Sequence, residues 1–263
     1  MSFRLDLPPT FADRLAELED GGHLAGMWVS SGSPVSAEIA AGSGLDWVLL
    51  DAEHSPLGLE TTTRLLQAMN GYPATPVVRV PACDRVLIKQ HLDLGAQNIL
   101  VPMVDTAADA EEAARSVRYP PHGVRGVGSA LARASRWNTV PDYLGRADEL
   151  VSLTIQIESV TAVENAEAIA SVEGIDAVFV GPSDLAASMG LLGQQTHERV
   201  TAAVLETFDA VRAAGKPVGV NAFDPVQARR YLDAGASFVL VGADVGLLAN
   251  GSRAWAKEWA SGV

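Results

Sequence analysis

Two carboxylates follow short apolar stretches in the second half of the chain. Glu158 ends the stretch TIQIE, and Asp184 ends the stretch VFVGPSD. In a barrel of parallel strands, residues at the carboxyl ends of the strands point into the active-site mouth. A hard divalent cation prefers oxygen ligands and needs few of them from the protein when substrate and water supply the rest. The sequence therefore predicts that Glu158 and Asp184 meet around a divalent metal ion.

A histidine beside acidic residues follows another apolar stretch, WVLL. Asp51 and Glu53 come just before His54. A carboxylate near an imidazole fixes the tautomer of the ring and raises its basicity, which is what a general base requires. The alternative is that His54 caps the next helix or binds a carbonyl group of the loop.

An arginine lies inside the otherwise apolar stretch PVVRV. Arg79 must reach a partner or the barrel mouth, because an unpaired buried charge strongly destabilises a fold. Its planar guanidinium suits a carboxylate or an enolate oxygen. The alternative is a structural ion pair with an acid of a neighbouring strand.

An amide precedes Glu158 by two residues. On a strand, Gln156 and Glu158 project to the same side, whereas Ile155 and Ile157 project to the opposite, helix-facing side. This alternation predicts that the polar pair faces the inside of the barrel.

The tetrapeptide GPSD predicts a tight turn into a helix. Gly181 and Pro182 make the turn, and Ser183 or Asp184 can cap the helix. Free backbone N–H groups at a helix start form an anion-binding site. A plain helix cap is the alternative interpretation.

Short apolar stretches alternate with alanine-rich helices along the chain. The stretches are nearly all apolar and rich in β-branched residues, which is typical of parallel strands covered on both faces. Expected strands are 24–29, 47–50, 77–80, 98–101, 151–158, 177–180, 217–220 and 238–241. Expected helices are 11–18, 59–69, 84–94, 107–117, 161–171, 198–214 and 225–234. This order favours an α/β fold, a (β/α)8 TIM barrel with an amino-terminal helix, over an open doubly wound sheet.

The segment 119–143 breaks this alternation. It is too long and too rich in Gly, Pro and Arg to be a simple connection, and such segments usually serve as lids or interface arms. Its arginines, with Trp137 and Tyr143, argue against disorder. The sequence leaves two roles open, one beside the active site and one in a subunit contact.

Composition limits the class of protein. A formal net charge of −13 opposes binding to nucleic acid or to anionic membranes, and no apolar stretch is long enough to span a bilayer. The single cysteine, Cys83, excludes an internal disulfide and a cysteine-based zinc site. Residues 1–22 lack the apolar core of a signal peptide. We therefore expect a cytoplasmic protein in which residues 1–263 form one barrel domain.

These stretches resemble the HpcH/HpaI family of metal-dependent pyruvate aldolases. Members of that family include 4-hydroxy-2-oxoheptanedioate aldolase and 2-dehydro-3-deoxyglucarate aldolase. The resemblance runs from Leu24 to about Leu248, and YPPHGVRGVGSALARASRWN contains its most specific part. The other matching segments are DWVLLDAEHSP, PVVRVP, IKQHLDLGAQNILVPMV, QIESVTAVEN, VFVGPSDLAASMG and FVLVGAD.

The resemblance implies roles for the charged residues. His54 would accept a proton, Asp93 would raise the basicity of His54, and Asp51 would support the same loop. Arg79 would stabilise the transition state, and Gln156 would contact the substrate.

The resemblance also implies a metal and a reaction. Glu158 and Asp184 would hold a divalent ion, Mg²⁺ or Mn²⁺ ahead of Co²⁺, Ni²⁺ or Zn²⁺. Gly181, Pro182, Ser183 and Asp184 would bind the carboxylate of pyruvate, chiefly through the backbone N–H of Ser183. A 4-hydroxy-2-oxo acid would be cleaved reversibly to pyruvate and an aldehyde through a pyruvate enolate. The chain would form a homohexamer, built as a dimer of trimers.

Two features leave details open. Close relatives in the family carry an aliphatic residue near Asn221, in the region that lines the acceptor pocket, so the acceptor aldehyde is not determined. Trp255 and Trp259 are four residues apart on the last helix, and they could pack across subunits or seal the protein's own barrel.

Three alternative functions come from different classes. The first is another 2-oxo acid lyase, such as an oxaloacetate decarboxylase, which uses the same enolate without an aldehyde pocket. The second is a non-catalytic binding protein that has lost its metal. The third is a structural reading in which the polar strand ends are only ion pairs, and the number of roles that would have to coincide argues against it.

Overall fold

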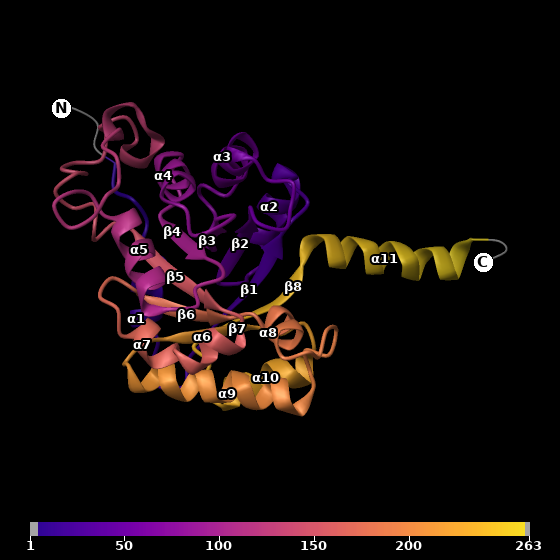
Figure 1. The fold of residues 1–263 in the computed structure, drawn as a ribbon. Coiled ribbons are helices and arrows are strands. Elements are labelled where there is room, and N and C mark those ends of the chain that lie inside the picture. Colours follow the sequence, from indigo (N-terminus) through magenta and orange to yellow (C-terminus); the bar gives the residue numbers. More distant parts are fainter. Residues whose placement is uncertain (1–4, 261–263) are drawn as a thin grey trace.

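All eight expected strands form, and they close into one parallel barrel (Figure 1). The computed structural model describes residues 5–260. Each strand pairs with the next along the chain, and the last pairs with the first. The (β/α)8 barrel is confirmed, and the open doubly wound sheet is wrong. The strands are β1 Leu24–Val29, β2 Trp47–Asp51, β3 Thr75–Arg79, β4 Asn98–Val101, β5 Ser152–Ile157, β6 Ala177–Val180, β7 Val218–Asn221 and β8 Phe238–Ala243.

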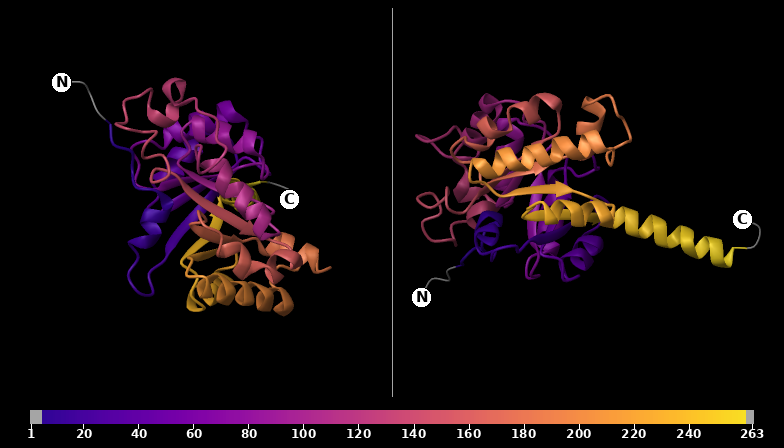
Figure 2. Two further views of the ribbon diagram at one scale, coloured as in Figure 1. Left: turned by 60° about the vertical axis from the view of Figure 1, so that its left-hand side comes forward. Right: turned by 90° about the horizontal axis from the view of Figure 1, so that it is seen from below.

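Helices follow the strands and surround the barrel, except the last helix, which extends away from it (Figures 1 and 2). One expected helix, 161–171, is divided in two at Asn165. The side chain of Asn165 donates to the backbone carbonyl of Asp105 at 2.9 Å, a local bond that competes with helix continuation. The helices are α1 Phe11–Ala16, α2 Pro34–Ala41, α3 Leu59–Ala68, α4 Arg85–Asp93, α5 Ala107–Val117, α6 Val160–Glu164, α7 Ala166–Ala170, α8 Pro182–Ser188, α9 Glu198–Ala213, α10 Pro225–Asp233 and α11 Asp244–Trp259, with short 3-10 turns η1 Ser129–Leu131 and η2 Arg133–Ser135.

Large aromatic side chains fill the inside of the barrel. The rings of Trp47, Phe179 and Phe238 lie with centroids 5.7 to 6.3 Å apart. Gly219 makes room for them, because a Cβ at this position would lie 2.3 Å from the ring of Phe238. Strand residues of the opposite parity, such as Val48, pack outward against the helices.

Helix α1 closes the amino-terminal end of the barrel. The ring of Phe11 lies 5.1 Å from that of Trp47 and 5.2 Å from that of Phe238. The backbone N–H of Phe11 donates to Oδ1 of Asn98 at 2.7 Å, and this bond fixes the helix against β4. The interior is therefore packed at this end, and the strand residues at the carboxyl end remain to build a site.

The segment 119–143 connects α5 to β5, so it lies at the amino-terminal rim of the barrel (Figure 1). Tyr119 and Tyr143 take part in a small hydrophobic cluster of their own there. This position corrects one expectation, because the segment does not lie beside the carboxyl ends of the strands in its own chain. A loop that follows a helix returns to the opposite rim from a loop that follows a strand.

The last helix, α11, does not pack along the barrel (Figures 1 and 2). None of its residues is buried, and the side chains of Trp255 and Trp259 are 72% and 77% exposed. These tryptophans do not seal the protein's own barrel. In the part of the chain that the structure describes, no helix is both long and apolar enough to cross a membrane.

Candidate active site

Polar side chains replace apolar ones at the carboxyl ends of the strands. They surround a cavity of about 380 Å³, which we call the mouth pocket. Strand parity places them, because Asp51, Arg79 and Gln156 continue the inward rows that begin with buried residues lower in the barrel. The mouth pocket is lined by Trp28, Ser30, Asp51, His54, Ser55, Arg79, Gln156, Phe179, Gly181, Pro182, Ser183, Asp184, Asn221, Phe223, Ala243 and Val245.

Arg79 is held from three sides at the base of the mouth pocket. Its Nε and Nη2 atoms lie 3.0 and 2.9 Å from Oδ1 of Asp51, and its Nη1 lies 2.9 Å from Oε2 of Glu53. The guanidinium stacks over the ring of Trp28 at 4.4 Å. The ion pair with an acid of the neighbouring strand is thus present, since Asp51 and Arg79 are in register on β2 and β3. Each Nη atom keeps one N–H group that can donate a hydrogen bond to a substrate oxygen.

Asp51 also shapes the loop that carries the histidine. Its Oδ1 accepts from the backbone N–H groups of Glu53 and His54 at 3.1 and 3.2 Å, and its Oδ2 accepts from the hydroxyl of Ser55. One buried carboxylate therefore fixes the loop and the guanidinium together.

His54 presents its imidazole to solvent at the rim of the mouth pocket. Its side chain is 66% exposed, and Nε2 lies 3.8 Å from Oε2 of Glu53. Of the two acids that precede His54 in the sequence, Glu53 is therefore the one whose carboxylate lies beside the imidazole. Burial raises the pKa of Glu53, and the Arg79 guanidinium opposes this shift. The signal in the sequence was the DAEH spacing, in which Glu53 is the nearest acid to His54.

Asp93 does not meet His54 within the chain. It is the last residue of α4, and its Oδ1 accepts from Nη2 of Arg125 at 3.1 Å. Helix α4 follows β3 and runs back to the amino-terminal rim, so its last residue lies away from the strand ends (Figure 1). Within residues 5–260 of one chain Asp93 therefore does not reach His54, and a role in raising the basicity of His54 stays a prediction.

Glu158 is a buried carboxylate without a cationic partner in the described part of the chain. Its Oε1 accepts from the backbone N–H of Met103 at 2.8 Å, and its Oε2 accepts from the amide of Gln156. Burial raises the pKa of Glu158 to about 7, and the charges of Asp184 and Glu53 add to the shift. A site that penalises a carboxylate in this way favours a bound cation.

The turn after β6 leaves backbone donors free. Gly181 is the N-cap of α8 and gives no side-chain cap, with Pro182 next, so the expectation that Ser183 or Asp184 caps this helix is wrong. Within residues 5–260 the N–H groups of Ser183 and Asp184 have no hydrogen-bond acceptor. A Cβ at Gly181 would lie 2.8 Å from Oε2 of Glu158, so only glycine lets the turn approach this carboxylate closely.

The oxygen atoms around Glu158 suit a divalent cation. Oε1 of Gln156 is buried and has no partner, and the carboxylate of Asp184 is close enough to raise the pKa of Glu158. Residues 5–260 hold no cluster of three or more His, Cys, Asp or Glu side chains for a metal. The two carboxylates and the free amide oxygen fit an ion whose other ligands come from substrate and water.

Two further residues belong to this site: Trp28, which the sequence analysis did not single out, and Asn221, which it placed only in the region of the acceptor pocket. Trp28, near the end of β1, stacks on Arg79, and its Nε1 donates to Oδ1 of Asn221 at 2.8 Å. Asn221 ends β7, where it also lines the mouth pocket. A tryptophan in an apolar strand gives no sign of a polar partner across the barrel.

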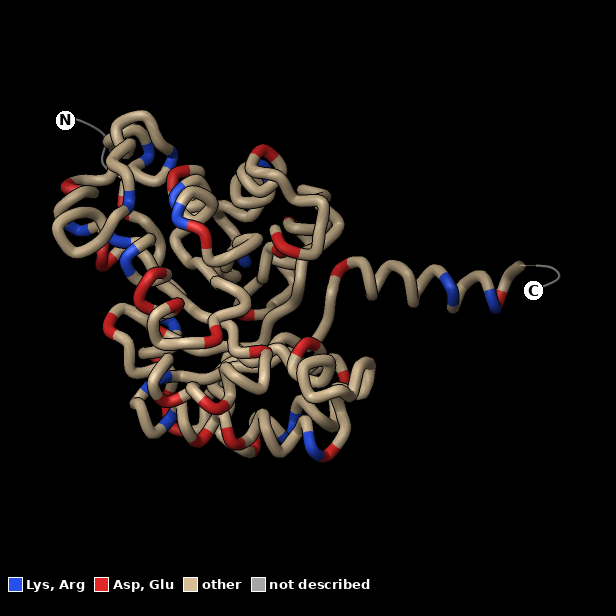
Figure 3. Tube along the Cα trace, in the orientation of Figure 1, with Lys and Arg blue, Asp and Glu red and all other residues tan. Residues whose placement is uncertain are grey.

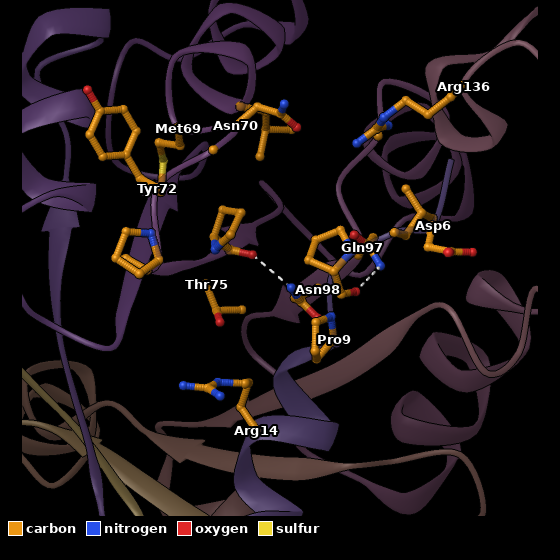
Figure 4. A pocket seen from close by; sticks show the side chains of 18 of the residues that line it. Asp6, Pro9, Arg14, Met69, Asn70, Tyr72, Thr75, Gln97, Asn98 and Arg136 are labelled. Atoms are coloured by element: carbon orange, nitrogen blue, oxygen red, sulfur yellow. Dashed lines mark hydrogen bonds between the residues drawn. The ribbon is translucent and has the colours of Figure 1, made fainter. Parts of the chain in front are cut away.

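A larger cavity, of about 690 Å³, lies beside α1 at the opposite end of the barrel (Figure 4). Arg14, Arg136, Asn98 and Gln97 line it, and Asn98 donates to the carbonyl of Pro76. None of the predicted site residues is among the lining residues. Size alone therefore does not locate the site.

Comparisons with known proteins give the family of the chain. Residues 24–251 match the model of the HpcH/HpaI aldolase/citrate lyase family. The chain is 49% identical over 260 residues to a hydroxypyruvate/pyruvate aldolase of Pseudomonas aeruginosa, covering 98% of this chain and 96% of that protein. It is 48% identical over 244 residues to a 4-hydroxy-2-oxo-heptane-1,7-dioate aldolase of Shigella sonnei, covering 93% of each.

A solved structure supports the same assignment. An HpcH/HpaI aldolase/citrate lyase family protein from Burkholderia cenocepacia J2315 superposes with a TM-score of 0.90 at 38% sequence identity, covering 95% of this chain and 98% of that one. The chain belongs to the HpcH/HpaI aldolase/citrate lyase family.

Proposed function

We propose that the protein is a divalent-metal-dependent pyruvate aldolase, which cleaves 4-hydroxy-2-oxo acids reversibly to pyruvate and an aldehyde. One observation in this chain supports the proposed activity independently of family membership. The Arg79 guanidinium, the His54 imidazole and the free N–H groups of the turn after β6 face the same mouth pocket, beside the buried Glu158 carboxylate. In this proposal residues 1–263 act as one catalytic domain.

Substrate binding uses the turn and the guanidinium. The substrate carboxylate accepts from the backbone N–H groups of Ser183 and Asp184, which have no acceptor in the described chain. The 2-oxo oxygen lies toward Arg79, which the ion pairs with Asp51 and Glu53 hold in one orientation. Gln156 contacts the substrate from β5. Preorganised donors of this kind stabilise the negative charge that develops on the oxygen during the reaction.

His54 moves the proton in this scheme. In the cleavage direction, its imidazole removes the proton from the 4-hydroxyl, the bond between C3 and C4 breaks, and the electron pair moves toward the 2-oxo oxygen beside Arg79. Glu53 lies beside the imidazole and stabilises the cation that forms. In the synthetic direction, the same imidazole removes a proton from the methyl group of pyruvate.

Glu158 and Asp184 would hold the metal, with Mg²⁺ or Mn²⁺ as the expected ion and Co²⁺, Ni²⁺ or Zn²⁺ as substitutes. When bound, the ion polarises the 2-oxo group and acidifies the neighbouring C–H bonds. The protein contributes the oxygen atoms and keeps the rest of the barrel interior dry through the aromatic layer below.

An assay for pyruvate release tests this function. We expect turnover of a panel of 4-hydroxy-2-oxo acids that stops when a chelator removes the metal and returns when Mg²⁺ or Mn²⁺ is added. Aldolases that work without a metal form a Schiff base on lysine. Here Lys89 lies within α4, Lys257 lies in α11, and Nζ of Lys216 donates to the carbonyl of Ile175 at 2.7 Å.

A trapping experiment under the same conditions can refute the metal mechanism. Borohydride added with pyruvate should trap no adduct, because no lysine lines the mouth pocket. A pyruvyl-lysine detected by mass spectrometry, or turnover that survives exhaustive chelation, would refute the metal mechanism.

We also propose that the protein is a homo-oligomer, and specifically a hexamer built as a dimer of trimers. Helix α11 has an apolar face that no other part of residues 5–260 covers, formed by Leu248, Trp255 and Trp259 at positions i, i+7 and i+11. Figure 3 shows that charged residues are sparse along this helix. A second copy is the partner we propose, since the chain exposes further large apolar side chains on its barrel helices, such as Ile39 of α2 at 70%. The segment 119–143, with Leu131 89% exposed, offers a separate surface, as a dimer of trimers requires.

Replacing Trp255 and Trp259 together with serine should dissociate the oligomer. Each buried tryptophan would contribute about 1.5–3 kcal/mol at the contact, so the dissociation constant should rise by about 100-fold or more. Light scattering coupled to size exclusion measures the mass. Arg253→Ser, on the same helix, is the control that should leave the mass unchanged. A wild-type monomer would refute the proposed oligomer.

A further inference from the structure

The indole of Trp28 fixes the orientation of one amide in the mouth pocket. An indole N–H only donates, so the atom of Asn221 that lies 2.8 Å from Nε1 must be the carbonyl oxygen, Oδ1. The Asn221 Nδ2 group is then turned away from the ring. The side chain cannot flip without losing this hydrogen bond.

The Nδ2 group of Asn221 has no acceptor within residues 5–260. Asn221 is half-buried, and it lines the mouth pocket together with Trp28 and Arg79. The side chains that follow it along this wall, Phe223, Ala243 and Val245, are apolar. An oriented donor beside these apolar side chains favours a ligand that carries an oxygen at that point.

The donor is also close to the reacting atoms. Trp28 lies between Asn221 and Arg79, hydrogen-bonded to the first and stacked at 4.4 Å on the second. The guanidinium thus lies over the face of the indole and the amide lies at its Nε1 edge, so a single side chain connects Asn221 to the guanidinium that the proposed function directs at the 2-oxo group. An oxygen that reaches Nδ2 must lie near the new carbon–carbon bond and not at the far end of a long acceptor.

We propose that Asn221 is a specificity residue, which donates a hydrogen bond to a hydroxyl on C3 or on C5 of the substrate, the carbons on either side of the C4 hydroxyl carbon. This inference rests on the proposed aldolase function and deepens it. Two substrates can supply the hydroxyl, a 2-hydroxyaldehyde as acceptor or a 3-hydroxy-2-oxo acid as donor. The chemistry recognised is the same in both cases.

Matched substrate pairs distinguish the two sources. In the acceptor arm, pyruvate reacts with glycolaldehyde or with propanal, which differ only by a hydroxyl in place of a methyl group. In the donor arm, hydroxypyruvate or 2-oxobutanoate reacts with propanal, and the pair again differs by hydroxyl against methyl. The measured quantity is the ratio of kcat/KM within each pair, compared between wild type and variant, so that intrinsic reactivity cancels.

Asn221→Leu should lower this preference for the hydroxyl member by about tenfold in one of the two arms, the usual effect of one lost neutral hydrogen bond. Asn221→Asp keeps an oxygen for Trp28 but has only acceptor atoms when ionised. A ligand oxygen beside position 221 must then donate a hydrogen bond to the carboxylate. A hydroxyl can donate, whereas an ether oxygen cannot, so Asn221→Asp should discriminate most against an ether. This second test applies if Asn221→Leu lowers the hydroxyl preference in the acceptor arm. In that case we expect Asn221→Asp to lower the preference for methoxyacetaldehyde over butanal by about tenfold.

Gln195→Leu is the matched control, because Gln195 is an exposed amide beside Asn221 in a small neighbouring cavity and contacts neither Trp28 nor Arg79. It should leave both ratios unchanged. Unchanged ratios in Asn221→Leu, or an equal fall in Gln195→Leu, would overturn the assignment of Asn221. In either outcome, turnover of pyruvate with propanal by the wild type would leave the proposed function standing. Failure of the wild type with every donor and aldehyde would refute the function itself.

Discussion

Glu158→Gln and Asp184→Asn should each abolish metal binding and lower aldol cleavage by about 10³-fold or more. A divalent ion supplies several kcal/mol of charge stabilisation to the enolate-like transition state, and about 1.4 kcal/mol corresponds to a factor of ten in rate. Both substitutions keep the size and shape of the side chain and remove its charge. Glu158 is buried with a raised pKa, so its loss of charge should not lower the melting temperature.

Three measurements on the same samples make this test specific. Metal content after gel filtration reports binding, pyruvate release reports cleavage, and thermal unfolding reports the fold. Glu164→Gln removes an exposed carboxylate of α6 and should change none of the three. Turnover that remains sensitive to chelator and close to the wild-type rate in either variant would remove that residue from the metal site.

His54→Ala should lower aldol cleavage by about 10²–10⁴-fold, the usual contribution of a positioned general base. Oxaloacetate decarboxylation should fall far less in the same variant. Decarboxylation forms the enolate by losing CO₂ and needs an electron sink, but no base has to remove a proton. His122→Ala, which changes an exposed histidine far from the mouth pocket, is the matched control.

Arg79 should behave differently from His54, because it acts on the oxygen that both reactions share. Arg79→Lys keeps the charge but loses the planar fork, and both activities should fall together. We prefer this variant to Arg79→Ala, which would leave the buried Asp51 carboxylate unpaired and destabilise the fold. The comparison uses kcat/KM for both reactions in each variant. Equal losses of both activities in His54→Ala would mean that His54 organises the site, and its role as general base would have to be withdrawn.

The sequence predicted which residues gather at the mouth of the barrel. Gln156 and Glu158 follow from the two-residue repeat of a strand, which is a local property of the backbone, and Arg79 follows from the cost of an unpaired buried charge. The fold class follows from the regular alternation of apolar strands and helices, and all eight strands lie within a few residues of their expected positions. Such patterns depend only on neighbours along the chain.

Contacts between distant parts of the chain could not be predicted in this way. The sequence offered Asp93 as the acid for His54, yet Asp93 ends α4 at the opposite rim and pairs with Arg125. The direction of a helix, and not its position in the sequence, decides which rim its last residue reaches.

The sequence by itself determined the barrel, its polar carboxyl end and its family. Only the tertiary structure decided that Trp28 joins Arg79 to Asn221 across the mouth, and that α11 leaves the barrel instead of covering it. The physical reason is the same in both cases. Backbone periodicity is set by adjacent residues, whereas closure of the barrel sets which side chains from β1, β3 and β7 meet, and no local pattern encodes that closure.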